Sequence, residues 1–214
     1  AGQTELEAVR RQADLLGLGM MEVTSPQQLV DHMADAFTLS RAGGRVTVLV
    51  LDEALWRQGG SLSLSQAPHR KPKEQAAPTP DAFTRAGTRP AVGQRQIDEL
   101  YRRHTRLTFR QNRDDPAPLA IITPANLFGR VMQALDQLDI AREVPVLSLG
   151  VLHPWRPDVI ERLHDRCGRL LVIDAATGWL TMHVSHAVAE WHATDKRAVV
   201  AEGCIDPSSA GGES

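Results

Sequence analysis

The chain has 214 residues and a net charge of −2, and 42% of its residues are hydrophobic, 23% charged and 4% aromatic. This length allows one large or two small domains, and the near-balanced charge gives no reason to expect a nucleic-acid or anionic-membrane partner. The sequence contains no run of about 18 apolar residues and no signal-peptide pattern at its first residues, so we expect a cytoplasmic protein without a membrane span.

Residues 1–57 predict a helix, a strand, a second helix and a second strand. Each helix begins at a capping-box pattern, Thr4 with Glu7 and Ser25 with Gln28. The strands are apolar runs at 18–23 and 46–51, and this order of elements predicts a parallel crossover. A unit this small buries little surface by itself. We therefore expect it to pack on the later domain, to complete another chain's sheet, or to be the end of a larger domain.

Residues 58–94 are rich in Gly, Ser and Pro and predict a linker, in which the basic cluster at 69–71 is solvent-exposed. A helical pattern then covers 94–111. It is interpreted as a connecting helix or, alternatively, as an interface helix that meets an acidic partner or a phosphate. Its polar side carries five arginines, Arg95, Arg102, Arg103, Arg106 and Arg110.

Residues 95–204 alternate between strand-like and helix-like segments and are followed by a tail at 205–214. Continuous apolar runs indicate strands covered on both faces, and apolar residues at steps of three and four indicate the covering helices. The alternation predicts a mostly parallel, three-layer α/β domain. The four predicted strands are 119–123, 144–149, 170–174 and 198–201, the last being an edge strand or an antiparallel one.

Motifs for common cofactors are missing or out of place. The glycines at Gly17 and Gly19 precede a strand instead of following one, so they do not form a dinucleotide-binding turn. No Gly-Asp-Gly motif for Mg²⁺ and thiamine diphosphate is found. His183 and His186 share a helix face but lack a third ligand, so no metal site is predicted. Two cysteines are too few for an iron–sulfur cluster.

The candidate catalytic residues are His153 and Asp174, because ligands of parallel sheets bind beyond the carboxyl ends of the strands. His153 would act as an acid or base while Asp174 holds its proton. The alternative is structural: His153 shapes a turn, Trp155 packs on the next helix, and Asp174 accepts hydrogen bonds from loop amides. The four loops expected at this edge are 123–126, 150–155, 174–178 and 202–204.

Residues 148–163, followed by 169–174, resemble the transketolase C-terminal-like domain of 2-oxoacid:ferredoxin oxidoreductases, closest to the indolepyruvate oxidoreductase alpha-subunit branch. Residues 26–40 and 46–51 resemble the end of that family's thiamine pyrimidine-binding domain. The resemblance implies a role in the oxidative decarboxylation of a 2-oxoacid to an acyl-CoA. It implies partner chains or further domains that carry thiamine diphosphate, Mg²⁺ and iron–sulfur clusters.

The matching stretches do not include the family's thiamine-activating glutamate, and the usual acidic pair after the third strand is Asp174-Ala175 here. No catalytic residue is therefore carried over, and no cofactor is expected in this chain. We expect the isolated chain to be inactive and to supply scaffold and subunit interface within an oligomer. Two alternatives stay open: a non-catalytic assembly or regulatory module, and an independent small-ligand binder that uses the crevice beside His153 and Asp174.

Overall fold

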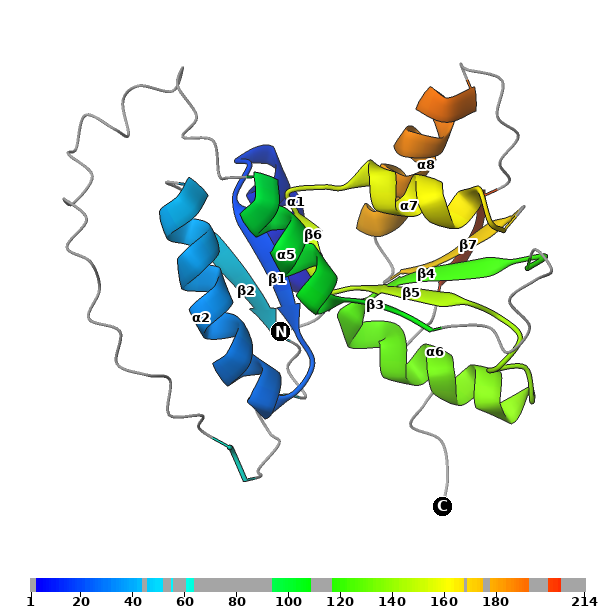
Figure 1. Cartoon of the computed structure of the whole chain (residues 1–214), viewed down its shortest axis with the longest axis horizontal. Coiled ribbons are helices and arrows are strands. Elements are labelled where there is room, and N and C mark those ends of the chain that lie inside the picture. Colours follow the sequence, from blue (N-terminus) through cyan, green and yellow to red (C-terminus); the bar gives the residue numbers. More distant parts are fainter. Residues whose placement is uncertain are drawn as a thin grey trace.

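The computed structural model describes residues 3–43, 46–51, 55, 61–63, 94–108, 117–167, 169–174, 178–192 and 200–204. In these residues the chain forms two β-sheets, each with its own helices, that lie side by side (Figure 1). The predicted tail at 205–214 and most of the predicted linker at 58–94, with its basic cluster, fall outside them. None of the helices in these ranges has the length and hydrophobicity of a membrane-spanning segment.

The larger sheet has five strands in the order β3-β5-β4-β7-β8. Strands β5, β4, β7 and β8 run parallel, and β3 pairs antiparallel with β5 at one edge. The predicted runs at 119–123, 144–149 and 170–174 form strands. Of the run at 198–201, the described residues 200–201 begin a parallel edge strand, which continues through 202–204, where a loop was expected. The bounds are β3 (Thr105–Leu107), β4 (Ala120–Pro124), β5 (Val146–Leu149), β7 (Leu170–Asp174) and β8 (Val200–Cys204).

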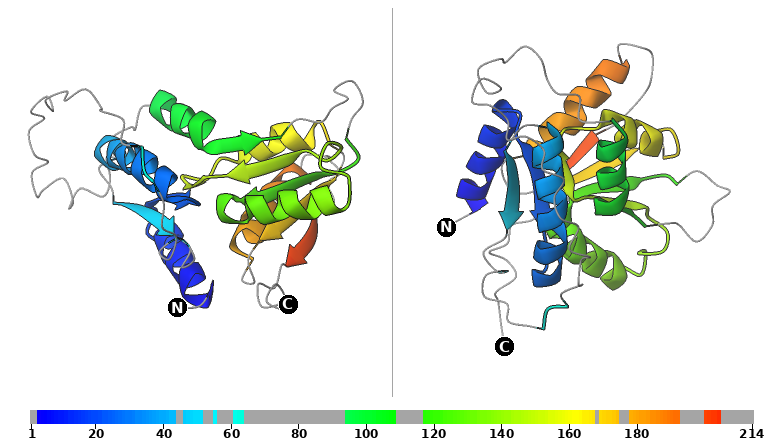
Figure 2. Two further views of the ribbon diagram at one scale, coloured as in Figure 1. Left: turned by 90° about the horizontal axis from the view of Figure 1, so that it is seen from below. Right: turned by 60° about the vertical axis from the view of Figure 1, so that its left-hand side comes forward.

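Helices cover both faces of this sheet, as continuous apolar strands require. On one face, Ile121 and Val146 pack against α6 (Ala125–Gln137). On the other face, Ile122 and Leu147 belong to a cluster with residues of α7 (Pro157–His164) and α8 (Trp179–His192). Figures 1 and 2 show α6 on one side of the sheet and α7 and α8 on the other. The predicted mostly parallel, three-layer α/β architecture is confirmed.

The smaller sheet contains β1 (Gly19–Val23) and β2 (Thr47–Leu51), which pair in parallel. They are joined through α2 (Pro26–Gly43), as predicted, and α1 (Gln3–Leu15) precedes them. The two helices pack on opposite faces, because Met20 lies in one cluster with Ala13 of α1, whereas Met21 lies in another with Leu39 of α2. The predicted cap of α2 forms: the Gln28 amide donates to Ser25 Oγ at 3.1 Å.

The third strand of the smaller sheet, β6 (Val151–His153), corrects the expected loop at 150–155, because it pairs antiparallel with β1. It follows β5 after the single residue Gly150. A side chain at Gly150 would place its Cβ 2.4 Å from the carbonyl oxygen of His104, so only glycine permits this close passage. Of the three alternatives for the early unit, the structure shows packing on the later part of the chain.

The helix predicted over 94–111 is also corrected. Helix α5 (Gln94–His104) ends earlier, and the next three residues form β3 along the edge of β5. The Val146 amide donates to Thr108 Oγ1 at 2.8 Å, which extends this pairing by one residue. The exposed backbone of β5 needs a hydrogen-bonding partner, and this need overrides the helical spacing of the apolar residues. Residues 109–111 lie outside the described part of the chain.

Candidate functional site

His153 lies at the end of β6, where the smaller sheet faces α8 and the C-terminal end of α1. Its Nδ1 is 3.3 Å from Oδ1 of Asp14, and the other carboxylate oxygen of Asp14 is 3.0 Å from Nε2 of His183. Asp14 therefore joins two histidines from distant parts of the chain. His183 also lies against two tryptophans, with ring centroids 5.1 Å from Trp155 and 4.3 Å from Trp179. The arrangement fixes α8 against α1.

Asp174 ends β7 and is 3% exposed. Its Oδ2 accepts hydrogen bonds from the amides of Leu180 at 2.5 Å and Thr181 at 3.3 Å. These are amides of the first turn of α8, which have no partner within their own helix. A carboxylate there also interacts favourably with the helix dipole. The contacts of Asp174 thus agree with the structural interpretation, in which it accepts hydrogen bonds from neighbouring amides.

Sequence reasoning missed a buried ion pair where the two sheets meet. Arg10 of α1 contacts Glu22 of β1, and each side chain is 1% exposed. The second carboxylate oxygen of Glu22 accepts a hydrogen bond from the amide of Asn126 at 3.2 Å. Pro124 at the start of α6 provides no side-chain cap, so Glu22 of the smaller sheet caps a helix of the larger one. The sequence signal that could have revealed this pair was Glu22 itself, a charged residue inside a strand predicted to be buried.

Burial raises the pKa of Glu22, while the charge of Arg10 and the bond from Asn126 oppose this rise. The charge of Asp174 adds to the rise, so the two carboxylates are electrostatic neighbours. A buried, hydrogen-bonded pair of this kind joins elements but leaves Glu22 poorly suited to serve a ligand.

Thiamine diphosphate, which the resemblance implies for the complex, needs carboxylate and amide oxygens for its Mg²⁺. The described residues contain no group of three or more His, Cys, Asp or Glu side chains that could hold a metal ion. Of the two histidines that share a helix face, His186 is 75% exposed and lies 3.5 Å from Glu190, whereas His183 is partly buried beside Asp14.

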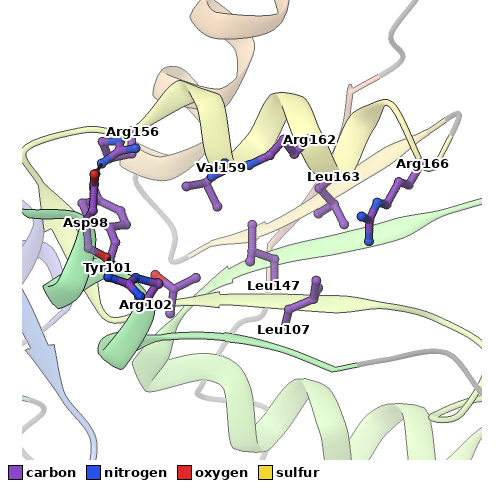
Figure 3. Close-up of a pocket in the computed structure, with 11 residues that line it drawn as sticks. Asp98, Tyr101, Arg102, Leu107, Leu147, Arg156, Val159, Arg162, Leu163 and Arg166 are labelled. Atoms are coloured by element: carbon purple, nitrogen blue, oxygen red, sulfur yellow. Dashed lines mark hydrogen bonds and ion pairs between the residues drawn. The ribbon is translucent and has the colours of Figure 1, made fainter. Parts of the chain in front are cut away.

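A separate groove of about 540 Å³ lies between α5, α7, β3 and β5, and neither His153 nor Asp174 lines it. Figure 3 shows α7 above it and the two strands below. Arginines and aliphatic residues make up most of its walls. The lining residues are Asp98, Tyr101, Arg102, Thr105, Leu107, Leu147, Arg156, Val159, Arg162, Leu163 and Arg166.

Comparison with known proteins gives two curated relatives, although no family model matches the chain. Indolepyruvate oxidoreductase subunit IorA of Methanothermobacter thermautotrophicus is 26% identical over 172 residues, covering 77% of this chain and 27% of the relative. The subunit of the same name from Methanothermobacter marburgensis is 23% identical over 171 residues, with the same two shares. The chain thus spans about a quarter of the length of these relatives.

Among solved structures, a 2-oxoglutarate:ferredoxin oxidoreductase from Magnetococcus marinus overlaps 90% of this chain and 41% of its own, with a TM-score of 0.51 and 14% identity. At this identity the likeness concerns the fold. Together with the two curated relatives, it confirms the resemblance that the sequence motifs indicated.

Proposed function

We propose that this chain is a structural part of a thiamine-diphosphate-dependent 2-oxoacid oxidoreductase complex that acts on an indolepyruvate-like or pyruvate-like substrate. It provides scaffold and subunit interface for oxidative decarboxylation. Thiamine diphosphate, Mg²⁺ and the iron–sulfur clusters are held by partner chains or by other domains. The observation that carries the proposal is the match over 172 residues to an indolepyruvate oxidoreductase subunit, which extends across 77% of the chain.

The contacts between the two sheets support a scaffold role. The polar groups buried there are engaged in structure: Glu22 with Arg10 and Asn126, and Asp174 with the start of α8. A catalytic acid or base needs access to a substrate proton. These carboxylates instead fix how the helices of one sheet meet the strands of the other.

Exposed apolar side chains support an interface role for the smaller sheet. Leu15 and Leu16 at the end of α1 are 86% and 69% exposed, and Phe37 of α2 is 66% exposed. Strand β2 forms the edge of its sheet, and within the described residues nothing pairs with its outer side. Unpaired strand edges and large exposed apolar side chains are typical of surfaces that meet another chain or domain.

The test is native mass spectrometry of the protein purified from its source cell. We expect it to co-purify with a chain that contains the Gly-Asp-Gly motif for thiamine diphosphate. The variant Phe37→Ser should weaken this association by about tenfold or more, because it removes a large apolar contact. The matched control Leu138→Ser changes a side chain that is 65% exposed beyond α6 and should leave the association unchanged.

Two results would contradict the proposal. One is a protein that remains alone at native concentration in the source extract. The other is calorimetric binding of thiamine diphosphate with Mg²⁺ to the isolated 214-residue chain at a micromolar Kd, because the proposal assigns that site to partner chains or other domains.

A further inference from the structure

The groove between α7 and the edge of the larger sheet has an apolar floor. Leu147 of β5 and Leu163 of α7 are 2% and 5% exposed, and both reach it from the core. Leu107 of the edge strand and Val159 of α7 are partly buried and extend this floor outward. Its volume of about 540 Å³ falls within the usual range for small-molecule sites.

One end of the groove is closed by fixed charges. Arg156, just before α7, contacts Asp98 of α5 and also binds both carboxylate oxygens of Asp158, at 2.6 and 2.8 Å. Its guanidinium lies 5.3 Å from the ring centre of Tyr101, whose hydroxyl donates to the carbonyl of Pro154. These contacts raise the pKa of Arg156 and use its hydrogen-bonding capacity. This end is therefore a rigid wall that links two helices.

Beyond this wall, α7 and the residues after it supply two arginines that are available to a ligand, Arg162 and Arg166. Arg166 follows α7, and no described residue provides its guanidinium with a hydrogen bond or ion pair; Figure 3 shows it directed toward the strands. Arg162 is 70% exposed and has one partner, Oδ2 of Asp158, at 3.1 Å. Arg156 contacts the same oxygen at 2.8 Å, so the guanidinium of Arg162 is turned toward Arg156. Exposed pairs of this kind contribute about 0–1 kcal/mol and are readily replaced. The two arginines are four residues apart, so Arg162 can exchange the exposed contact with Asp158 for an anion held at Arg166.

We infer that this groove binds a small organic anion with an apolar body of one or two rings and a carboxylate or phosphate head. The body lies on Leu107, Leu147 and Val159, and the head meets Arg162 and Arg166. An acidic peptide is the less suitable occupant, because the wall at Arg156 and Asp98 closes the groove where an extended chain would need to continue. The inference does not depend on the proposed oxidoreductase role.

The test is isothermal titration calorimetry of the 214-residue chain with 2-naphthoate as the probe. For a ligand of this size we expect a Kd between about 0.05 and 1 mM. The neutral analogue 2-naphthalenemethanol should bind at least about tenfold more weakly, because it lacks the charge that the arginines recognise. Raising the salt concentration should weaken the binding of naphthoate and leave the binding of the alcohol nearly unchanged.

Paired variants locate the site. Arg162→Gln with Arg166→Gln should reduce naphthoate affinity by about tenfold or more, and Leu107→Ser should reduce the affinity for both probes. The matched control, Arg130→Gln with Arg142→Gln, removes two exposed arginines outside the groove and should change affinity by less than about twofold. Circular dichroism and a thermal melt establish that each variant is folded.

Three results would overturn the inference: no heat with naphthoate up to several millimolar, equal affinity for the acid and the alcohol, or unchanged affinity in the groove variant. A fourth is that an oligoglutamate decapeptide binds more tightly than naphthoate and loses affinity in the same variant. The groove would then be a docking surface for an acidic protein segment.

Discussion

The two sheets meet their surroundings through different kinds of contact. In the larger sheet, Ile122 and Val172 lie among aliphatic side chains of α7 and α8, and both are completely buried. In the smaller sheet, β1 is equally buried but also carries Glu22, which contacts Arg10 and the start of α6. One sheet is therefore stabilised mainly by apolar burial, and the other also depends on a directional polar contact.

This difference indicates that the smaller sheet obtains its position from the larger one. Strand β6 enters the smaller sheet directly from β5. Glu22 of β1 supplies the cap that the start of α6 lacks. Hydrophobic burial is tolerant of small shifts, whereas a buried ion pair fixes distance and orientation. We therefore expect changes at the polar contact to loosen the smaller sheet first, and changes in the aliphatic core to destabilise the whole chain.

The largest effect is expected from Arg10→Met, which leaves Glu22 buried without its cation. Breaking such a buried pair should lower the free energy of unfolding by about 3–5 kcal/mol. Urea denaturation measures this loss. Hydrogen exchange should show faster exchange in β1 and β2 than in β4 and β7. The double variant Arg10→Met with Glu22→Met should recover at least half of the loss, and a double variant as unstable as the single one would show that the pair is not the cause.

The apolar counterpart is Ile122→Ala in the centre of the larger sheet. Removing the buried atoms of a fully buried isoleucine costs about 2–5 kcal/mol, including the cavity that remains. Because one apolar cluster contains residues of both sheets, exchange should accelerate in all central strands together. Exchange confined to β4 and β7 would show that the two sheets unfold independently. Leu138→Ser, on an exposed leucine, is the control and should change stability by less than about 0.5 kcal/mol.

Acid should weaken the contact between α2 and α5. Burial, and then the charge of His104, lower the pKa of His32 to about 4 from its ordinary 6.5, although Asp31 and Asp35 oppose this shift. The unfolded chain binds this proton near pH 6.5 and the folded chain only near pH 4. The contribution of His32 to stability is therefore complete above pH 6.5 and is lost as the pH falls toward 4.

Urea denaturation at pH 7 and pH 4.5 measures this effect. The native chain should lose roughly 2 kcal/mol more than His32→Gln over this interval, since one pKa unit corresponds to about 1.4 kcal/mol. The variant serves as the control for other groups that titrate over this pH interval. Equal losses in the two proteins would show that His32 titrates normally.

The sequence was sufficient for the parallel strands of the larger sheet, because strands covered on both faces carry continuous apolar runs at 119–123, 144–149 and 170–174. It was insufficient for β6, because a single glycine at Gly150 looks the same whether a strand ends there or passes to another sheet. The partners of Glu22 could not be identified either. Arg10 and Asn126 come from separate elements, and only the folded chain brings them to one carboxylate.

The smallest effect concerns the candidate residue Asp174, and it separates the two interpretations of that residue. If Asp174 only caps α8, then Asp174→Ala should cost about 1–2 kcal/mol, because two amides at the start of the helix lose their acceptor. Part of this cost is offset, since removing its charge relieves the nearby Glu22. Asp174→Asn keeps an acceptor oxygen and should recover about half of the loss. A catalytic role predicts the same order of stability but a different effect on turnover: both variants would abolish the activity of an assembled complex, although Asn recovers stability.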